Sequence, residues 1–274
     1  MFWTRLASGI VLIIIAVLAL IVGRAPLAVL LWAVSMAGFR ELTKALKCAN
    51  HEKRLNCLEI LGLAGVTAYY AAMFFSGSDT LLIMCIVGTL LAEMFVYVLA
   101  FPRFHADQAV AAVFSFLYAP VLLSFVYLTR MYPQGIYTVW MILISSWGCD
   151  TCAYVVGKLI GRKKIFPVLS PHKSLEGCIG GVAGAALIGW LYGHFFVEAA
   201  YPNQTVAWII ALICAVGAVM SMVGDLAASG IKRNHNIKDY GKLIPGHGGI
   251  MDRFDSMIVT APMTYFLTIL LLSV

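Results

Sequence analysis

Residues Leu6 to Val22 read LASGIVLIIIAVLALIV, a run in which no side chain carries a charge. A helix needs about 20 apolar residues to cross a hydrocarbon core of roughly 30 Å, so this run suits one membrane crossing. It lacks the two-residue alternation of barrel strands, and backbone groups cannot stay unpaired in lipid, so a helix is predicted. No clear small-residue cleavage site follows, and we expect a retained helix rather than a cleaved signal peptide.

The rest of the chain repeats this pattern. Hydrophobic residues make up 62% of the 274 residues and charged residues 12%, which is more apolar than a soluble core could bury. An all-α polytopic membrane protein is predicted, with one transmembrane domain made of N-terminal helices (1–134) and catalytic helices and loops (135–274). A merged first pair of spans would lower the count to eight, and amphipathic residues Arg40–Leu46 could extend the second span. The nine predicted spans are Leu6–Val22, Pro26–Phe39, Leu58–Phe75, Thr80–Phe101, Ala109–Leu128, Tyr137–Ile160, Gly177–Val197, Thr205–Ile231 and Ser256–Val274.

The basic residues predict the orientation of these spans. With nine spans and a cytoplasmic N-terminus, seventeen of the nineteen Lys and Arg residues fall in cytoplasmic segments, and only Arg24 and Arg130 fall outside. This agrees with the positive-inside rule and puts the C-terminus on the opposite side. The loops at 161–177 and 232–255 also contain Gly, Pro, Ser, His and acidic residues, which orientation alone does not require.

Three acidic residues, Glu93, Asp150 and Asp225, lie inside predicted spans, in their cytoplasmic halves. A carboxylate there costs several kcal/mol unless a cation, proton, metal or water compensates it. This placement favours a catalytic cavity open to the cytoplasm. A transporter would place coupling acids near the midplane in two related halves, which are not evident here, although Asp150 is deep enough to keep that class open. Glu93 is either a hydrogen-bonded structural acid or a functional one.

The seven cysteines predict no disulfide framework, because their number is odd and they lie mostly in spans or on the cytoplasmic side. Cys149 and Cys152 have the spacing of a redox or zinc half-site. A second pair is absent from the sequence, so we expect both to pack as small apolar residues.

The polar stretch from Ser229 to Asp255 combines three kinds of chemistry. Asp252 and Asp255 are three residues apart at the start of a helix, so both carboxylates can face one way and offer hard oxygen ligands to Mg²⁺. The turn at 245–249 contains Gly248 and Gly249, whose backbone N–H groups can approach an anion closely. Together with cations that bind phosphate, this predicts phosphoryl or nucleotidyl transfer. Those cations are Lys232, Arg233, Lys238 and Arg253.

This stretch resembles the signature of the phosphatidate cytidylyltransferase family. The shared pattern is Ser229, two residues, Lys-Arg, four residues, Lys-Asp, a His-Gly-Gly turn and Asp-Arg-x-Asp. Two upstream segments resemble further polar motifs of the family: Asp150-Thr-x-Ala-Tyr154-x-x-Gly157 and Ser170-Pro-x-Lys173-Ser174-x-Glu176-Gly177. The N-terminal half matches only in its pattern of spans.

The resemblance implies the reaction of CTP with phosphatidic acid to give CDP-diacylglycerol and pyrophosphate, with Mg²⁺ as one or two ions and a monovalent cation possible. It implies a bacterial-type inner membrane, a site facing the cytoplasm, the lipid bilayer as surroundings and a homodimer; no nucleic-acid partner is expected. Asp225, Asp252 and Asp255 would hold the metal, with Asp150 and Asp239 as further ligands. His247 would orient a phosphate or shape the turn. The substrate-binding residues would be Ser170, Lys173, Ser229, Lys232, Arg233, Lys238, Gly248, Gly249 and Arg253.

Two other functions stay open from the residues. One is a related nucleotidyl- or phosphotransferase that acts on another lipid, such as an isoprenoid alcohol or an ether lipid, because nothing in the spans identifies the acyl chains. The other is a cation- or proton-coupled transporter that uses Asp150 and Asp225. A CDP-alcohol phosphotransferase is disfavoured, because its Asp-Gly-x-x-Ala-Arg motif is not found here.

Overall fold

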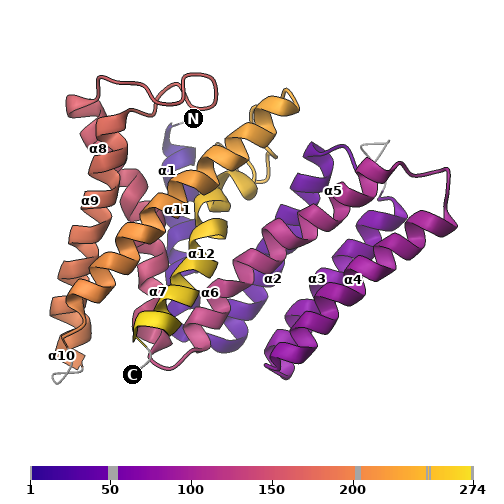
Figure 1. The fold of residues 1–274 in the computed structure, drawn as a ribbon, viewed down its shortest axis with the longest axis horizontal. Helices are drawn as coiled ribbons and strands as arrows, with labels where there is room; N and C mark the ends of the chain where they lie inside the picture. The colour runs from indigo at the N-terminus through magenta and orange to yellow at the C-terminus, as the bar shows by residue number, and fades with distance from the viewer. Residues whose placement is uncertain (1, 49–54, 201–204, 245, 247, 273–274) are drawn as a thin grey trace. The chain divides into compact units, whose positions relative to one another are not determined.

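The computed structural model describes residues 2–48, 55–200, 205–244, 246 and 248–272, with side chains from residue 9 onward. The described residues fold mainly into helices (Figure 1). No strand occurs within those ranges. Three short π-helical turns, η1 to η3, interrupt the longer helices. The elements in chain order are α1 Phe2–Val22, α2 Arg24–Ala45, α3 Cys57–Phe75, α4 Asp79–Leu99, α5 Ala106–Phe116, η1 Leu117–Val121, α6 Leu122–Met131, α7 Gly135–Leu143, η2 Ile144–Gly148, α8 Cys149–Ile160, α9 Leu175–Tyr192, η3 Gly193–Val197, α10 Glu198–Ala200, α11 Ala207–Asn234 and α12 Met251–Leu272.

The predicted membrane fold is confirmed. Among the residues that the structure describes, eight helical runs are long and apolar enough to cross a membrane, and α1 adds a shorter apolar stretch, Gly9–Val22. Each of the nine predicted spans corresponds to one of these runs. α2 continues past Phe39 to Ala45, which is the extension that residues Arg40–Leu46 allowed. The orientation of the two termini stays a prediction.

A glycine separates the first two helices. Gly23 has φ 68° and ψ −153°, a backbone conformation that residues with a Cβ rarely adopt. α1 therefore ends at Val22 and α2 begins at Arg24. The first two spans are not merged.

The π-helical turns mark where long spans change their hydrogen bonding. η1 contains Pro120, which has no backbone N–H and cannot continue an α-helical ladder. η2 ends at Gly148, directly before α8, so Asp150 lies in the first turn after a widened segment. Such single π turns are frequent at functional sites.

The chain divides into two compact units. The first contains residues 1–127 and 234–253, and the second contains residues 128–233 and 254–274. The first unit has a core around Cys48, Leu58 and Phe104, and the second has a core around Met141, Ile213 and Cys214. The single membrane domain expected from the sequence stays a prediction.

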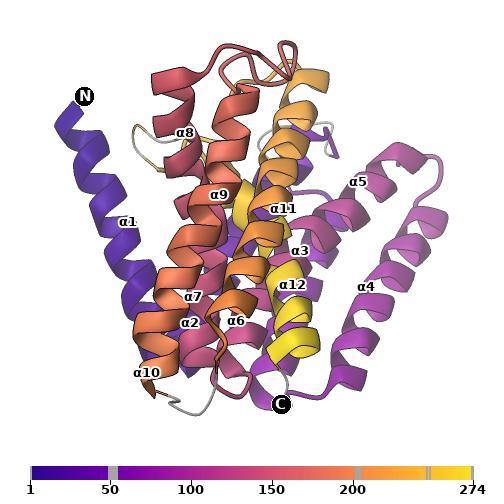
Figure 2. The same ribbon diagram turned by 60° about the vertical axis from the view of Figure 1, so that its left-hand side comes forward.

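Within the second unit, α8 and α9 lie side by side through a stripe of glycines (Figures 1 and 2). A Cβ at Gly184 would lie 2.5 Å from Cys152 Sγ, and one at Gly181 would lie 3.0 Å from Cys149 Sγ. A Cβ at Gly180 would overlap Val156. The cysteines therefore pack as small residues, as predicted, and the glycine stripe is used within the chain.

Candidate active site

A cavity of about 450 Å³ lies in the second unit among α8, the loop before α9, the first turn of α9 and α11. Its polar lining is mostly basic, and one acid, Asp150, contributes to it. Met222 and Cys178 belong to the apolar part of the wall. An open, positively charged cavity of this kind suits an anionic ligand. The charged and polar residues that line it include Asp150, Lys158, Lys164, Ser170, His172 and Lys173.

The loop from Gly161 to Ser174 is held by the start of α9. Glu176 accepts hydrogen bonds from the backbone N–H groups of Arg162, at 3.0 Å, and Lys163, at 3.2 Å. Ser174 caps α9 by accepting the N–H of Gly177 at 3.2 Å. A Cβ at Gly177 would lie 2.9 Å from the Ala153 carbonyl oxygen, so glycine allows the close approach to α8. The Ser-x-Glu-Gly motif thus shapes one wall of the cavity.

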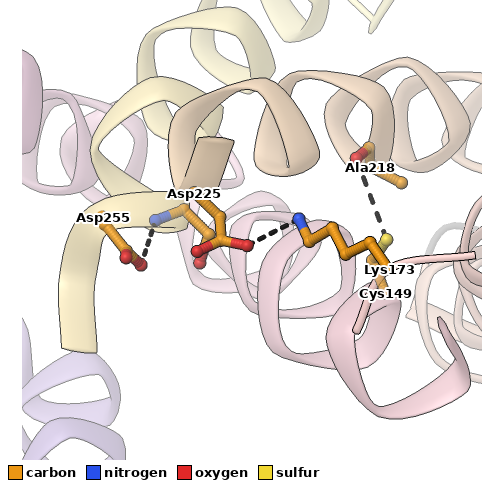
Figure 3. Close-up of polar contacts among 6 residues, drawn as sticks. Cys149, Lys173, Ala218, Asp225 and Asp255 are labelled. Carbon is orange, nitrogen blue, oxygen red and sulfur yellow. Dashed lines mark hydrogen bonds and ion pairs between the residues drawn. The ribbon is translucent and has the colours of Figure 1, made fainter. Parts of the chain in front are cut away.

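Lys173 connects this loop to α11 through an ion pair with Asp225 (Figure 3). The Lys173 side chain is 20% exposed and the Asp225 side chain 30%. In such a partly desolvated place an ion pair is stronger than on an open surface. The pair joins the Ser170–Gly177 motif to an acid inside a span, and that acid lies more than fifty residues after Lys173 in the chain.

Two further acids lie near this pair. Asp255 is buried on α12 and accepts the backbone N–H of Ser256 at 2.8 Å. Asp150 lies near the Ser256 side chain and within electrostatic range of Asp225 and Lys173. Asp255 lies within the same range of Asp225, Asp150 and Lys232. The second unit therefore gathers three carboxylates and two lysines.

Close packing of α11 and α12 brings these acids together. A Cβ at Gly224, the residue before Asp225, would lie 2.7 Å from the Asp255 carbonyl oxygen. Both helices belong to the second unit over this contact. Glycine at this position lets the two acid-bearing segments approach.

The first unit contains the turn at 248–252, in which the Asp252 carboxylate accepts hydrogen bonds from backbone N–H groups. Asp252 Oδ2 accepts the N–H of Tyr240 at 2.9 Å and that of Gly249 at 3.0 Å. Gly248 has φ 84°, and its carbonyl accepts the N–H of Ile244 at 3.0 Å. The Gly249 N–H thus donates its hydrogen bond to Asp252, and its contact with a substrate phosphate stays a prediction.

Glu41 is the residue of this region that the sequence interpretation missed. Its carboxylate accepts the N–H groups of Ile250, at 3.0 Å, and Met251, at 2.9 Å. The only sequence signal is an acid four residues before the end of an apolar helix. Nothing in the local pattern connects it to residues more than two hundred positions away.

The other predicted site residues are placed as follows. Ser229 is partly exposed on α11, and Arg233 is exposed at the end of that helix. His247 lies outside the described residues. Glu93 is fully buried on α4. Among the described residues, neither of its carboxylate oxygens has a hydrogen-bond partner, so the structure does not show Glu93 as a hydrogen-bonded structural acid. Also exposed, in the first unit, are Lys238, Asp239 and Arg253.

The carboxylate oxygens of the second unit are ligands of the type that a hard divalent cation prefers, but they do not form a complete coordination shell. Over the described part of the chain, no three or more His, Cys, Asp or Glu side chains are grouped closely enough to hold a metal ion. Mg²⁺ usually takes only one or two carboxylates and completes its shell with water and substrate phosphate. The mutual repulsion of Asp150, Asp225 and Asp255 would be relieved by such an ion.

Comparison with known proteins agrees with the sequence motifs. Residues 3–271 match the model of the cytidylyltransferase family. A Bacillus subtilis protein named phosphatidate cytidylyltransferase is 28% identical over 270 residues, 96% of each chain. A Staphylococcus haemolyticus protein of the same name is 36% identical over 172 residues, 63% of this chain and 64% of that relative. A Staphylococcus aureus (strain COL) protein of that name is 37% identical over 172 residues, again 63% of this chain and 64% of the relative.

Proposed function

Because this chain belongs to the cytidylyltransferase family, we propose that it transfers the cytidylyl group of CTP to phosphatidic acid. The products would be CDP-diacylglycerol and pyrophosphate. The observation that carries the proposal is the meeting of Asp150, Asp225 and Asp255 with Lys173 and Lys232 in one unit of a membrane protein. Carboxylates and lysines together suit a reaction between two phosphate-bearing substrates.

In the proposed reaction, a phosphate oxygen of phosphatidic acid attacks the α-phosphorus of CTP. A bond forms between that oxygen and the α-phosphorus, and the bond from the α-phosphorus to the bridging oxygen breaks, so that pyrophosphate leaves with the electron pair. A phosphate monoester has a second pKa of about 6 and is already ionised near neutral pH, so no strong general base is required. Catalysis then depends on positioning and on neutralising charge.

Two lysines would supply the positive charge that stabilises the phosphates during this step. Lys173 at the cavity wall and Lys232 near Asp255 would attract the triphosphate and stabilise the negative charge that develops on pyrophosphate. We propose that Asp225 and Asp255, with Asp150, would hold a Mg²⁺ ion, which would supply positive charge against the CTP phosphates. Asp239 and Asp252 are further proposed ligands, and Ser170 lines the same cavity as Lys173.

We further propose that the site faces the cytoplasm of a bacterial-type inner membrane. The support is the distribution of basic residues along the sequence, which would put the loops at 161–177 and 232–255 on the side where CTP is found. A homodimer is the proposed assembly. The bilayer supplies phosphatidic acid to such a site directly.

A substrate panel tests the proposed function. Purified full-length protein is incubated with CTP and Mg²⁺ and given phosphatidic acid, an isoprenoid phosphate or no lipid. CDP-lipid formed from phosphatidic acid supports the proposal, and product formed only from the isoprenoid phosphate would select a different lipid substrate. Ion flux in proteoliposomes without nucleotide turnover would select a transporter and contradict the proposal.

A further inference from the structure

Glu41 sits in an unusual place for an acid. It lies in the last two turns of α2, near the negative end of that helix dipole, where a carboxylate is unfavourable. Its two oxygens instead reach the opposite end of another helix dipole, because they accept the N–H groups of Ile250 and Met251 at the start of α12. The acid therefore stabilises α12 rather than its own helix.

The loop is shaped around this carboxylate. A Cβ at either Gly241 or Gly249 would come within 3.0 Å of Glu41 carboxylate atoms, so any larger residue would push the acid away. The Met251 side chain is buried, and a Cβ at Gly38 would lie 3.2 Å from its sulfur. Glycines on both α2 and the loop thus allow the approach.

Two carboxylates together order the turn. Asp252 accepts the N–H of Gly249, and Glu41 accepts the next two, those of Ile250 and Met251. Ile250 and Met251 lie at the N-cap and at the first position of α12, where N–H groups have no partner in the helix's own ladder. Glu41 accepts the N–H groups of Ile250 and Met251, although it lies 209 and 210 residues before them in the chain.

We propose that Glu41 is a positioning residue of the active site. It holds the Gly248-Gly249 turn and the first turn of α12 in the conformation from which the signature residues act, without touching substrate. The catalytic part of this inference rests on the proposed function. The structural part does not, because it concerns hydrogen bonds in the protein without ligands.

The first test is hydrogen exchange in the metal-free, full-length protein, with Glu41→Ala and Glu41→Gln. Loss of both acceptors in Glu41→Ala should speed exchange in the peptide containing Ile250 and Met251 by about 10-fold. Glu41→Gln keeps one good acceptor and should fall between. The control is Glu59→Gln. Glu59 is a buried acid in the first turn of α3, and it accepts the Asn56 N–H and the Thr43 hydroxyl. That control should leave the α12 peptide unchanged.

The second test is kinetic and uses the same variants. Glu41→Ala should lower kcat by between about 10- and 100-fold, the range seen when a supporting hydrogen bond behind a reacting group is removed. The KM for phosphatidic acid should change less than 3-fold, as for a role in positioning rather than lipid binding. Glu59→Gln should stay within about 2-fold of wild type in both constants.

The outcomes separate this inference from the proposed function. Unchanged exchange in Glu41→Ala would overturn the structural role, whether or not the wild-type protein is active. Faster exchange with wild-type kcat would overturn the link to catalysis. A wild-type protein that forms no CDP-lipid would contradict the proposed function, while the exchange result would still decide whether Glu41 orders the turn.

Discussion

Lys173 forms an ion pair with Asp225, and this contact joins the loop before α9 to α11 (Figure 3). Lys173 belongs to the Ser170–Gly177 motif and Asp225 was predicted as an acid inside a span, and the structure brings them together. Each also lies in electrostatic range of Asp150. The pair therefore links the cavity lining to the carboxylate group of the proposed site.

Replacing Lys173 with Met should impair both stability and activity. The free energy of unfolding should fall by about 1–3 kcal/mol, less than the 3–5 kcal/mol typical of a fully buried pair. CDP-lipid formation should fall by at least about 100-fold, because a positive charge at the cavity wall is lost. Thermal melts and the CTP assay check both effects. Lys163→Met, at an exposed position of the same loop, is the control, and an equal loss in that variant would refute a specific role.

Replacing Asp255 with Asn should stabilise the metal-free protein and abolish turnover. The change removes one of three mutually repelling carboxylates, while Asn Oδ1 can still accept the Ser256 N–H. With a chelator present, Tm should rise by about 2–4 °C. Mg²⁺ should then raise the Tm of wild type but not that of the variant. The control is Asp79→Asn, an exposed acid at the start of α4. An equal Mg²⁺ shift in wild type and Asp255→Asn would argue against Asp255 as a ligand.

Gly184→Ala should destabilise the packing of α8 against α9. The added Cβ would lie 2.5 Å from Cys152 Sγ, and overpacking of this kind costs about 1–3 kcal/mol. Gly88→Ala on α4 is the matched control, since a Cβ there meets nothing within 4 Å. That change should be neutral or stabilising, because Ala favours helix over Gly. Urea or thermal unfolding of both variants measures the difference, and equal stability would contradict the packing account.

Cysteine labelling can test both burial and orientation. Burial raises the pKa of the Cys48 thiol to about 12, so it stays protonated and should remain unlabelled by maleimide from pH 7 to pH 9 until the protein unfolds. Cys57 is exposed at the start of α3 and should be labelled in the folded protein. Mass spectrometry identifies the labelled sites.

The same experiment with a membrane-impermeant maleimide reports the side. In the proposed topology, Cys57 is reached in inside-out vesicles and protected in intact cells. Labelling of Cys57 from the outside would reverse the orientation deduced from the basic residues.

The sequence was enough to locate the helices because apolar runs and their polar breaks are local properties. The span from Leu58 to Phe75 was predicted to within one residue of α3 for that reason. The π turn before Asp150 has no comparable local signal.

The site could be predicted only in part. Motif spacing singled out Lys173 and Asp255, and Asp225 stood out as an acid inside a span; the structure places the three side chains in the second unit, and their roles stay predictions. Glu41 was missed because it acts through backbone N–H groups, which leave no pattern in the side chains they bind. The contact of Asp252 Oδ2 with Gly249 and Tyr240 likewise follows from the folded turn rather than from spacing.

The most direct test of the central claim follows the phosphorus atoms of CTP. Purified full-length protein in lipid-containing detergent is given phosphatidic acid, Mg²⁺ and CTP that is labelled on either the α- or the γ-phosphate. The proposed reaction predicts that α-label enters the lipid fraction as CDP-diacylglycerol, while γ-label is released as pyrophosphate in equal amount. Folded protein that leaves α-label out of the lipid fraction would contradict the account.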